Sequence, residues 1–306
     1  MIRYIIRRLL YFIPTLIAIY TAAFLVMHAA PGSPFAAEKN LTPEAQAARE
    51  AEFHLDKPLW QQYLLNGWDL ASLRGHTSMR YEGRNVIHDI LAPAFPVSLS
   101  LGVLALGLAV IVGTAAGVVS AARPRTLADY AVMAGALVGI SQPSFVIASL
   151  LMAAFVFGLG WLPVGGWGSP SQIILPAVAL AALPAAYIAR LVRTGMLDVL
   201  SADFVRTARA KGLSERAILL DHALPTAWMP VLGYLGPAAA AIFTGSFVVE
   251  KIFAIPGIGQ HFIDSALHRD YPMILATVML YAALLVVFNL LVDIGYAYVD
   301  PRIRYE

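Results

Sequence analysis

Cysteine is absent from this sequence, and charged residues are scarce. Without cysteine, the chain forms no disulfide and offers no thiolate for catalysis or metal binding. Asp, Glu, Lys and Arg make up 13% of its 306 residues, against about 25% in a soluble globular domain. The formal net charge of +2 is too small to favour nucleic acid as a partner. The composition therefore predicts a protein with much of its surface in contact with something other than water.

Short motifs typical of catalysis and nucleotide binding are also missing. The sequence has no Gly-x-Ser-x-Gly elbow, no His-Glu-x-x-His zinc helix and no Gly-x4-Gly-Lys-Ser/Thr loop. No pair of histidines has ligand spacing with a nearby acid on one helix face; the histidines are His28, His54, His76, His88, His222, His261 and His268. We therefore expect no catalytic residue, no metal site and no bound cofactor in this chain.

What the sequence does contain is long stretches without Asp, Glu, Lys or Arg. A helix that crosses the ~30 Å hydrocarbon core needs about 20 mostly apolar residues. The charge-free stretches of that length are 9–37, 93–122, 130–189, 226–249 and 271–292. The third is too long for one crossing, and Gly, Pro and Trp between residues 158 and 171 divide it. The sequence thus predicts an all-α membrane protein of six transmembrane helices, near residues 9–29, 97–121, 130–157, 172–193, 227–249 and 272–297.

The orientation of these spans follows from the basic residues, which are retained on the cytoplasmic side. The first apolar run is longer than the 7–15 residues of a cleaved signal peptide, so we expect it to remain as an anchor. With the N-terminus inside, the two short outer loops hold only Lys251 and Arg269. The basic residues on the cytoplasmic side are then Arg3, Arg7, Arg8, Arg123, Arg125, Arg190, Arg193, Arg206, Arg209, Lys211, Arg216, Arg302 and Arg304. Both termini are predicted to be cytoplasmic.

The first outer loop, near residues 30–96, is predicted to hold two helices. Thr42, Pro43 and Glu44 provide a capping hydroxyl, a first-turn proline and an acid near the positive end of the helix dipole. A second helix is expected to begin near Pro58. Its apolar face is formed by Leu59, Trp60, Tyr63, Leu64 and Trp68. That face could lie on the membrane surface, dock on a partner or pack on the outer rim of this chain.

Two groups of helix-breaking or small residues lie inside the predicted spans. The first is Ser141, Gln142 and Pro143, where proline removes a backbone hydrogen bond and bends the helix. The second is Gly236, Pro237 and Gly245. Each group is either a bend or a widening beside a substrate path, or a packing adjustment between helices. The sequence leaves both interpretations open.

The longest cytoplasmic loop, near residues 194–225, is predicted to form two short helices around a glycine. Residues 202–210 have high helix propensity, Gly212 supplies a stop, and Ser214 with Glu215 begins a second helix. The loop is too polar to enter lipid and too short to be a domain. We therefore expect it to bind a partner protein.

This loop resembles the cytoplasmic loop shared by the permease subunits of bacterial ATP-binding-cassette (ABC) importers. The consensus of that loop is Glu-Ala-Ala, three residues, Gly, nine residues, Ile, any residue and Leu-Pro. At the same spacing this chain has Arg206-Thr207-Ala208, Gly212 and His222-Ala223-Leu224-Pro225. The Glu, the first Ala and the Ile of the consensus are replaced by Arg206, Thr207 and His222. The sequence of residues Arg206–Leu213 resembles that of the peptide-transporting branch of these importers.

Further motifs along the chain resemble the B-type subunit of oligopeptide permeases. They are Ala30–Phe35, Leu162-Pro163 with Gly165-Gly166-Trp167, Pro256–Gln260, Arg269-Asp270-Tyr271 and Asp300–Tyr305. The resemblance implies a type I ABC importer permease fold in the bacterial inner membrane, with oligopeptides as cargo. Relatives of this pattern also carry dipeptides, nickel complexes and antimicrobial peptides, so the cargo stays open.

The resemblance also implies partners and site residues. The partners are a second, C-type permease subunit, two cytoplasmic ATP-binding subunits that hold ATP and Mg, an extracytoplasmic peptide-binding protein and membrane lipids. Coupling to the ATPases is assigned to Arg206, Thr207, Ala208, Gly212, Leu213, Ser214, Glu215, Arg216, Leu224 and Pro225. The outer mouth, where the binding protein docks, is assigned to Pro256, Gly257, Ile258 and Gly259.

An ion-coupled secondary transporter is the remaining alternative. Such a protein usually places ionisable groups near the bilayer centre. Only Asp293 and Asn289, in the last predicted span, suit that role, and Asp293 lies close to the inner surface. A structural role for Asp293 is favoured.

Overall fold

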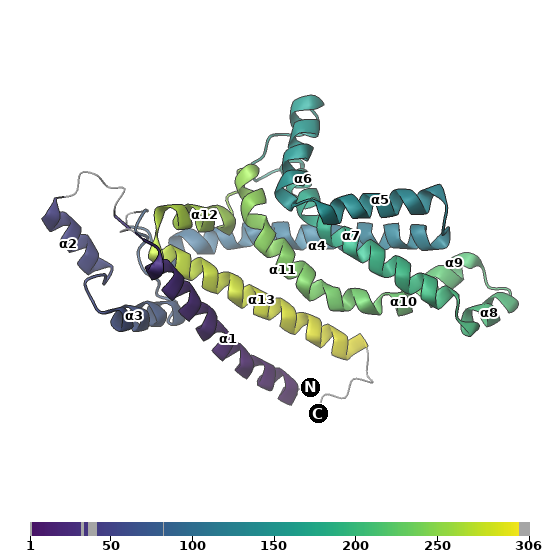
Figure 1. The fold of residues 1–306 in the computed structure, drawn as a ribbon, viewed down its shortest axis with the longest axis horizontal. Helices are drawn as coiled ribbons and strands as arrows, with labels where there is room; N and C mark the ends of the chain where they lie inside the picture. Colours follow the sequence, from purple (N-terminus) through teal and green to yellow (C-terminus); the bar gives the residue numbers. More distant parts are fainter. Residues whose placement is uncertain (1, 32–33, 36–41, 82, 300–306) are drawn as a thin grey trace. The chain divides into compact units, whose positions relative to one another are not determined.

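The computed structural model describes residues 2–31, 34–35, 42–81 and 83–299 of the chain. Figure 1 shows its helices, which are α1 (Ile2–Ala29), α2 (Pro43–Glu52), α3 (Leu59–Ala71), η1 (Val86–Leu91), α4 (Ala92–Ala122), α5 (Leu127–Ser141), α6 (Ser144–Leu151), η2 (Met152–Gly158), α7 (Pro170–Leu200), α8 (Asp203–Ala210), α9 (Glu215–Ala217), η3 (Ile218–Ala223), α10 (Leu224–Ala227), α11 (Met229–Ile252), α12 (Ile258–His268) and α13 (Tyr271–Val299). In this described part, the only strand-like pairing is one bridge between Thr77 and Asn85. The all-helical class predicted from the sequence is confirmed.

Helices long and apolar enough to cross a membrane number four among the described residues, or six if each of two bent pairs is one crossing. The four contain residues 10–29, 86–122, 170–200 and 271–292. One bent pair is α5 with the segment Ser144–Gly158, and it turns by 112°. The other is the segment Glu215–Ala227 with α11, and it turns by 55°. The six spans predicted from the sequence are the upper end of this range.

The contacts divide the chain into two compact units. The first unit is Met1–Val97 with Gly257–Val286, and the second unit is Ser98–Pro256 with Val287–Glu306. Each unit has its own buried residues, and each is described separately below.

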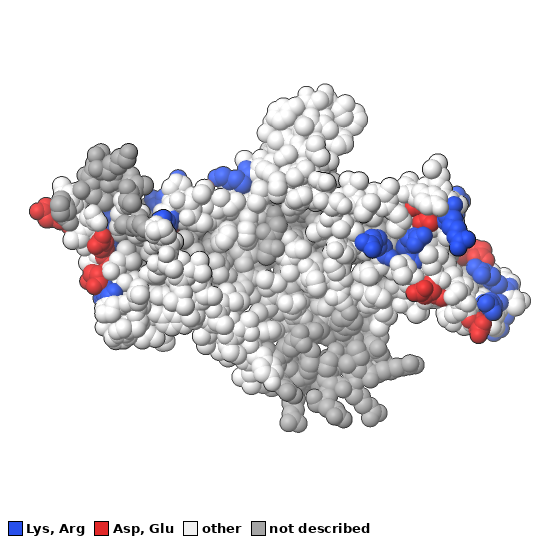
Figure 2. All heavy atoms as spheres, in the orientation of Figure 1, with Lys and Arg blue, Asp and Glu red and all other residues white. Residues whose placement is uncertain are grey.

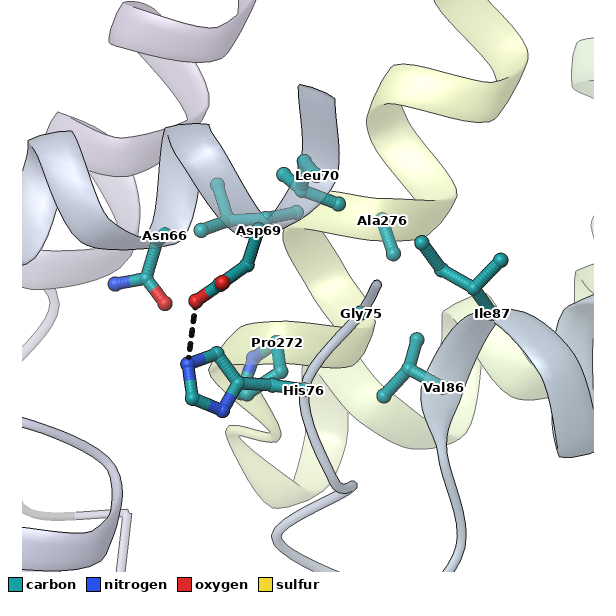
Figure 3. Close-up of a pocket in the computed structure, with 10 residues that line it drawn as sticks. Asn66, Asp69, Leu70, Gly75, His76, Val86, Ile87, Pro272 and Ala276 are labelled. Atoms are coloured by element: carbon teal, nitrogen blue, oxygen red, sulfur yellow. Dashed lines mark ion pairs between the residues drawn. The ribbon is translucent and has the colours of Figure 1, made fainter. Parts of the chain in front are cut away.

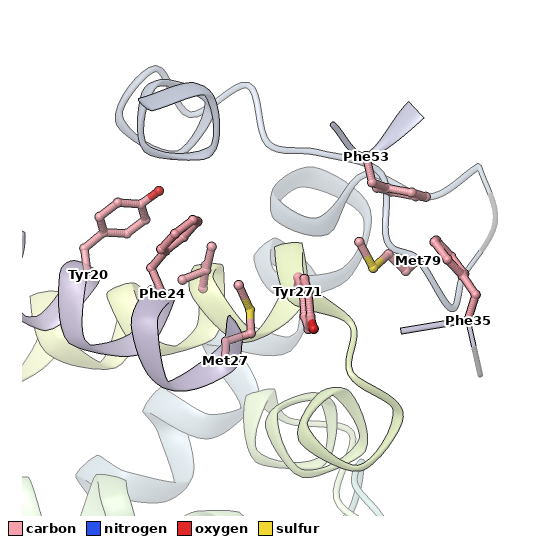
Figure 4. Packing of buried hydrophobic residues seen from close by; sticks show 8 residues of the cluster. Tyr20, Phe24, Met27, Phe35, Phe53, Met79 and Tyr271 are labelled. Carbon is pink, nitrogen blue, oxygen red and sulfur yellow. The ribbon is translucent and has the colours of Figure 1, made fainter. Parts of the chain in front are cut away.

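The core of the first unit joins the segment between α1 and α4, predicted to be the outer loop, to the ends of two long helices. Its buried residues, drawn in Figure 4, are Tyr20, Phe24, Met27, Phe35, Phe53, Met79, Tyr271 and Leu275. Aromatic rings of α1 contact the outer loop: Phe24 meets Tyr63 edge-on, with 5.4 Å between ring centroids. The outer loop is therefore packed onto α1 and α13 through a shared aromatic cluster.

A buried carboxylate fixes the outer loop to the start of α13. Asp270 is 1% exposed. It accepts hydrogen bonds from the Ser78 hydroxyl and, at 3.3 Å, from the backbone N–H of Arg80. Its second oxygen accepts from the backbone N–H of Met273 at 3.2 Å, which caps α13. One side chain thus satisfies donors from two segments that lie far apart in the sequence.

The second unit is organised around α7, which packs against α5, α6, α10 and α11. Two glycines of α4 allow a close approach to α7. A Cβ atom at Gly113 would lie 2.6 Å from the Ala185 carbonyl oxygen, and one at Gly117 would lie 2.6 Å from Val192 Cβ. Small residues four apart commonly permit such close packing of membrane helices.

The helix break predicted at the proline motif is larger than a kink. α5 ends at Ser141, Gln142 has an extended backbone with φ −107° and ψ 133°, and Pro143 precedes α6. A residue before proline is disfavoured in the helical region because the proline ring clashes with its backbone. The helix therefore stops and restarts in a new direction, instead of bending through a continuous α-helix.

Candidate functional site

The segment after α7 forms the two short helices that the sequence predicts. α8 ends at Ala210, and Gly212 has φ +79°, a conformation that side chains disfavour. The backbone N–H of Leu213 returns to the Ala208 carbonyl at 3.2 Å and closes the turn. The Ser214 hydroxyl then accepts from the backbone N–H of Ala217 at 3.3 Å, which caps α9. The predicted glycine stop and serine start are confirmed.

A small core lies between α8 and the start of η3, which continues directly from α9. Val205 and Ile218 are fully buried, and Ala208 is buried between them. Val199 and Leu200, at the end of α7, pack against this cluster. Because the core includes the end of α7, the pair is attached to that helix by packing as well as by the chain.

An exposed ion pair connects the two ends of the α8–α9 turn. Arg209 Nε and Nη2 donate to the two carboxylate oxygens of Glu215 at 2.8 and 3.2 Å. The hydrogen bond that the Arg209 guanidinium donates to Glu215 raises the pKa of Arg209 above its ordinary value. Figure 2 shows basic and acidic side chains gathered over this end of the second unit. Since both partners are exposed, the pair sets the shape of the turn more than it stabilises the chain.

The residues assigned to coupling are brought together here, but their surroundings differ. Most of them are exposed: Arg206, Thr207, Gly212, Leu213, Ser214, Glu215, Arg216 and Pro225. Ala208 is buried in the small core, so its contribution is to packing. Leu224 is half-buried, and with Pro225 it lines an apolar groove of about 790 Å³ between α4 and α11. Seven of the exposed residues lie in or beside the Gly212 turn, between Arg206 and Arg216, whereas Pro225 lies at the groove.

One exposed aromatic residue on this surface was not among the residues predicted from the sequence. Phe204, in the first turn of α8, is 50% exposed, next to the exposed Asp203. An aromatic ring left in solvent in a polar loop is typical of a residue that anchors a protein interface. The only sequence signal for it is a large apolar residue directly after the acid that begins α8.

A buried ion pair beside the α7 end was also missed. Asp129 accepts from Arg193 Nε at 2.7 Å and from Arg193 Nη2 at 2.9 Å. The Ser120 hydroxyl and, at 2.9 Å, the backbone N–H of Arg125 donate to the same carboxylate. The group joins the end of α4, the start of α5 and the last third of α7. We call Ser120, Asp129 and Arg193 the clamp.

The four residues assigned to the outer mouth are mostly buried. α11 ends at Ile252, and α12 begins at Ile258 after the capping residue Gly257. Pro256 is exposed, whereas Gly257, Ile258 and Gly259 are buried. Among these four, only Pro256 is accessible to a docking protein, and the other three residues are packed inside the chain.

The residues assigned to a substrate path divide in the same way. Ser141, Gln142, Pro143 and Pro237 are exposed. Gly236 is buried, and a Cβ atom there would lie 3.0 Å from Asn289 Oδ1 of α13. A packing role for Gly236 is the simpler interpretation.

Two residues that the sequence suggested for a substrate path or for ion coupling have side-chain surroundings outside the described part. Gly245 lies inside α11, but its surroundings are outside the described residues, and so is the side chain of Asp293. Their roles stay predictions.

Family models match nearly the whole length of the chain. The model described as "Binding-protein-dependent transport system inner membrane component" matches residues 113–305. The model of the N-terminal part of such membrane components matches residues 1–102.

Curated relatives match over their full length. The chain is 48% identical, over 307 aligned residues covering 100% of both chains, to the oligopeptide transport system permease protein OppB of Escherichia coli (strain K12). It is 44% identical to OppB of Haemophilus influenzae with the same coverage. It is 43% identical to the dipeptide transport system permease protein DppB of Bacillus subtilis (strain 168), covering 99% of this chain and 98% of the relative.

A solved structure supports the fold. A chain of the MetNI methionine ABC transporter, in an inward-facing conformation, superposes with a TM-score of 0.57. The match is 17% identical and covers 68% of this chain and 95% of that chain. At this identity the likeness concerns the arrangement of helices.

Proposed function

Because this chain belongs to the family of binding-protein-dependent transport system inner membrane components, we propose that it is a permease subunit of an ABC importer that translocates oligopeptides. Full-length relatives named for oligopeptide and dipeptide transport support this cargo class. The observation that carries the proposal is the α8–α9 pair: a polar two-helix element with its own core, attached to the end of a long apolar helix.

The topology in this proposal has six spans and two cytoplasmic termini. The third span is then α5 with the segment Ser144–Gly158, and the fifth span is α11, with the Glu215–Ala227 segment left on the cytoplasmic side of it. The α8–α9 pair faces the cytoplasm, where most of the basic residues lie. This is the type I ABC importer arrangement in the bacterial inner membrane, with one permease domain and an outer loop near residues 30–96.

In the proposed mechanism, the α8–α9 pair is the contact with a cytoplasmic ATPase. Closure of the ATPases on ATP and Mg displaces the pair, and the pair displaces α7 because its core includes Val199 and Leu200. A packed element passes on a displacement only if it stays rigid, since coupling acts between discrete arrangements of packed parts. The chain itself carries no catalytic step; hydrolysis is assigned to two partner subunits.

The remaining partners follow from the same family. A second, C-type permease subunit completes the path, and an extracytoplasmic binding protein delivers peptide at the outer mouth. The groove that Leu224 and Pro225 help to line is open on the second unit. It leaves an apolar surface beside the coupling element.

Substitutions of Gly212 test the coupling role. A Cβ atom there meets no atom within 4 Å, so the cost of a side chain is the positive φ, roughly 1–2 kcal/mol. We expect Gly212→Leu to leave the complex assembled while peptide-loaded binding protein no longer stimulates ATP hydrolysis or uptake. Gly212→Asn is the matched control, because asparagine adopts this conformation most readily after glycine. Normal uptake of labelled pentapeptide by the Gly212→Leu complex in liposomes would contradict the proposal.

The same liposomes test the cargo. Pentapeptide and dipeptide are offered in parallel, with and without the binding protein. Accumulation of pentapeptide supports the oligopeptide assignment. Uptake of dipeptide alone would move the chain to the dipeptide branch, and ATPase stimulation without entry of either peptide would reject peptides as cargo.

A further inference from the structure

One face of α3 is exposed among the residues that the structure describes. The exposed fractions are 64% for Trp60, 59% for Leu64 and 67% for Trp68. These residues are four apart, so they form one stripe along the helix. The sequence left three coverings open for this face, and the described residues of the first unit leave these three side chains exposed.

The opposite face of α3 is packed against α1. His28 Nε2 lies 3.0 Å from Gln62 Oε1, and Thr21 Oγ1 lies 2.8 Å from the Tyr63 hydroxyl. The Tyr20 hydroxyl donates to the Tyr63 carbonyl at 2.7 Å. Hydrogen bonds between neighbouring helices are typical of packing within a membrane, where water does not compete.

These contacts set the depth of α3 along α1. Gln62 meets His28 near the end of α1, whereas the Tyr20 ring lies 3.4 Å from where a Cβ atom of Gly67 would be. α3 therefore runs back along α1. Tyr20 precedes Ala29 by nine residues, about 14 Å at 1.5 Å per residue. That is close to half of the ~30 Å hydrocarbon core.

The position of α1 in the bilayer is limited by charge. Its apolar span is residues 10–29, and Arg7 and Arg8 precede that span directly. The helix cannot slide far enough to bring all of α3 into water without drawing these arginines into the hydrocarbon. α3 is thus held beside the half of the span that ends at Ala29.

The charge of α3 fits a lipid environment. Asp69 is its only charged residue. Figure 3 shows the Asp69 carboxylate directed toward His76, with Oδ2 lying 2.8 Å from His76 Nε2. The carboxylate therefore lies against a side chain of the first unit, and the stripe carries two tryptophans, which prefer the membrane–water boundary.

We propose that the Trp60–Leu64–Trp68 stripe contacts lipid, with α3 embedded in the leaflet on the Ala29 side of the bilayer. The occupant is the acyl-chain and headgroup boundary of the lipid. α3 then anchors the outer loop in the membrane beside α1. Only the identity of that leaflet as the outer one rests on the proposed function; the lipid contact does not.

Spin labels can test this directly, because the chain has no cysteine. Single Leu64→Cys and Trp68→Cys variants carry a nitroxide in the assembled importer in nanodiscs, with the unsubstituted complex as the labelling blank. The collision rate of each nitroxide is measured with oxygen, which partitions into lipid, and with a nickel chelate, which stays in water. Leu25→Cys, on the exposed side of α1, is the lipid reference, and Ala48→Cys, exposed on α2, is the water reference.

We expect the oxygen-to-nickel ratio at residues 64 and 68 to match that at residue 25 and to exceed that at residue 48 severalfold. Brominated lipid should also quench tryptophan fluorescence more in the parent than in the Trp60→Phe/Trp68→Phe variant. Ratios like that at residue 48 would overturn the proposal. Shielding from both reagents that arises only when the binding protein is added would also overturn it, in favour of a protein-docking face. ATPase stimulation, measured on the same samples, reports separately on the proposed function.

Discussion

The clamp offers a sharp test of how α7 is held. Asp129 has a side chain that is 3% exposed, and Arg193 is 27% exposed. The carboxylate accepts four hydrogen bonds, two of them from the guanidinium. Removing one partner of a buried ion pair costs about 3–5 kcal/mol, because the other charge stays buried without compensation. Because the Arg193 side chain is partly exposed to solvent, the lower end of that range applies. Arg193→Met should therefore cost about 3 kcal/mol.

A double-mutant cycle separates the pair from its neighbours. Asp129→Asn keeps acceptors for Ser120 and Arg125 but loses the charge, so we expect a cost of about 1.5–3 kcal/mol. The loss of stability in the double variant should be smaller than the sum of the two single losses by about 1–3 kcal/mol, because the double variant leaves no unpaired charge. Arg190→Met, an exposed arginine on the same helix, is the control, with an expected change within about 0.5 kcal/mol.

The assays are denaturation in mild detergent, followed by circular dichroism, and ATP hydrolysis by the reconstituted complex. Arg193→Met should unfold at lower denaturant concentration than Arg190→Met. Peptide-loaded binding protein should also stimulate its hydrolysis less. Two results would refute the reasoning: an Arg193→Met chain as stable as the parent, or single losses that add in the double variant.

Three further predictions concern packing, coupling and the outer loop. Gly113→Ala should destabilise by about 1–3 kcal/mol through its contact with the α7 backbone, whereas Gly107→Ala, with no atom within 4 Å, should be neutral or stabilising; thermal melts compare the two. Phe204→Ala should weaken ATPase binding more than tenfold while Phe204→Leu weakens it less, as measured by co-purification under dilution; equal binding would remove Phe204 from the interface. Ser78→Ala removes a donor from the buried Asp270 carboxylate and should cost about 1.5–3 kcal/mol, seen as faster proteolysis of the outer loop; unchanged proteolysis would show that this bond does not hold the loop.

Features set by short stretches of sequence were predictable. The Thr42 cap of α2, the start of α3 after Pro58 and the positive φ of Gly212 each depend on a few neighbouring residues. The length of charge-free stretches likewise predicts helices that can span a membrane. The direction change at Pro143 was predicted as a kink, but its size was not, because the residues after the break decide where the next helix packs.

Features set by contacts between distant residues were not predictable from spacing. Asp129 and Arg193 are 64 positions apart, and each alone looks like a charge at the edge of an apolar stretch. The apolar face of α3 was recognised, but periodicity does not show which of its residues touch the same chain. Tyr63 lies against α1, whereas Trp60 and Trp68 are left exposed.

The coupling loop and the clamp should fail in distinguishable ways. The α8–α9 pair acts through the end of α7, and the clamp ties α7 to α4 and α5 near that end. If force passes from the loop through α7, disruption of either part leaves basal hydrolysis and removes its stimulation by the binding protein. A Cβ atom at Gly212 would meet no atom within 4 Å, so its substitution changes the loop and costs only the strain of the positive φ, roughly 1–2 kcal/mol. Arg193 supports a buried charge, so its loss lowers stability as well. Uncoupling with the smaller loss of stability, about 1–2 kcal/mol, therefore indicates the loop, and uncoupling with the larger loss, about 3 kcal/mol, indicates the clamp.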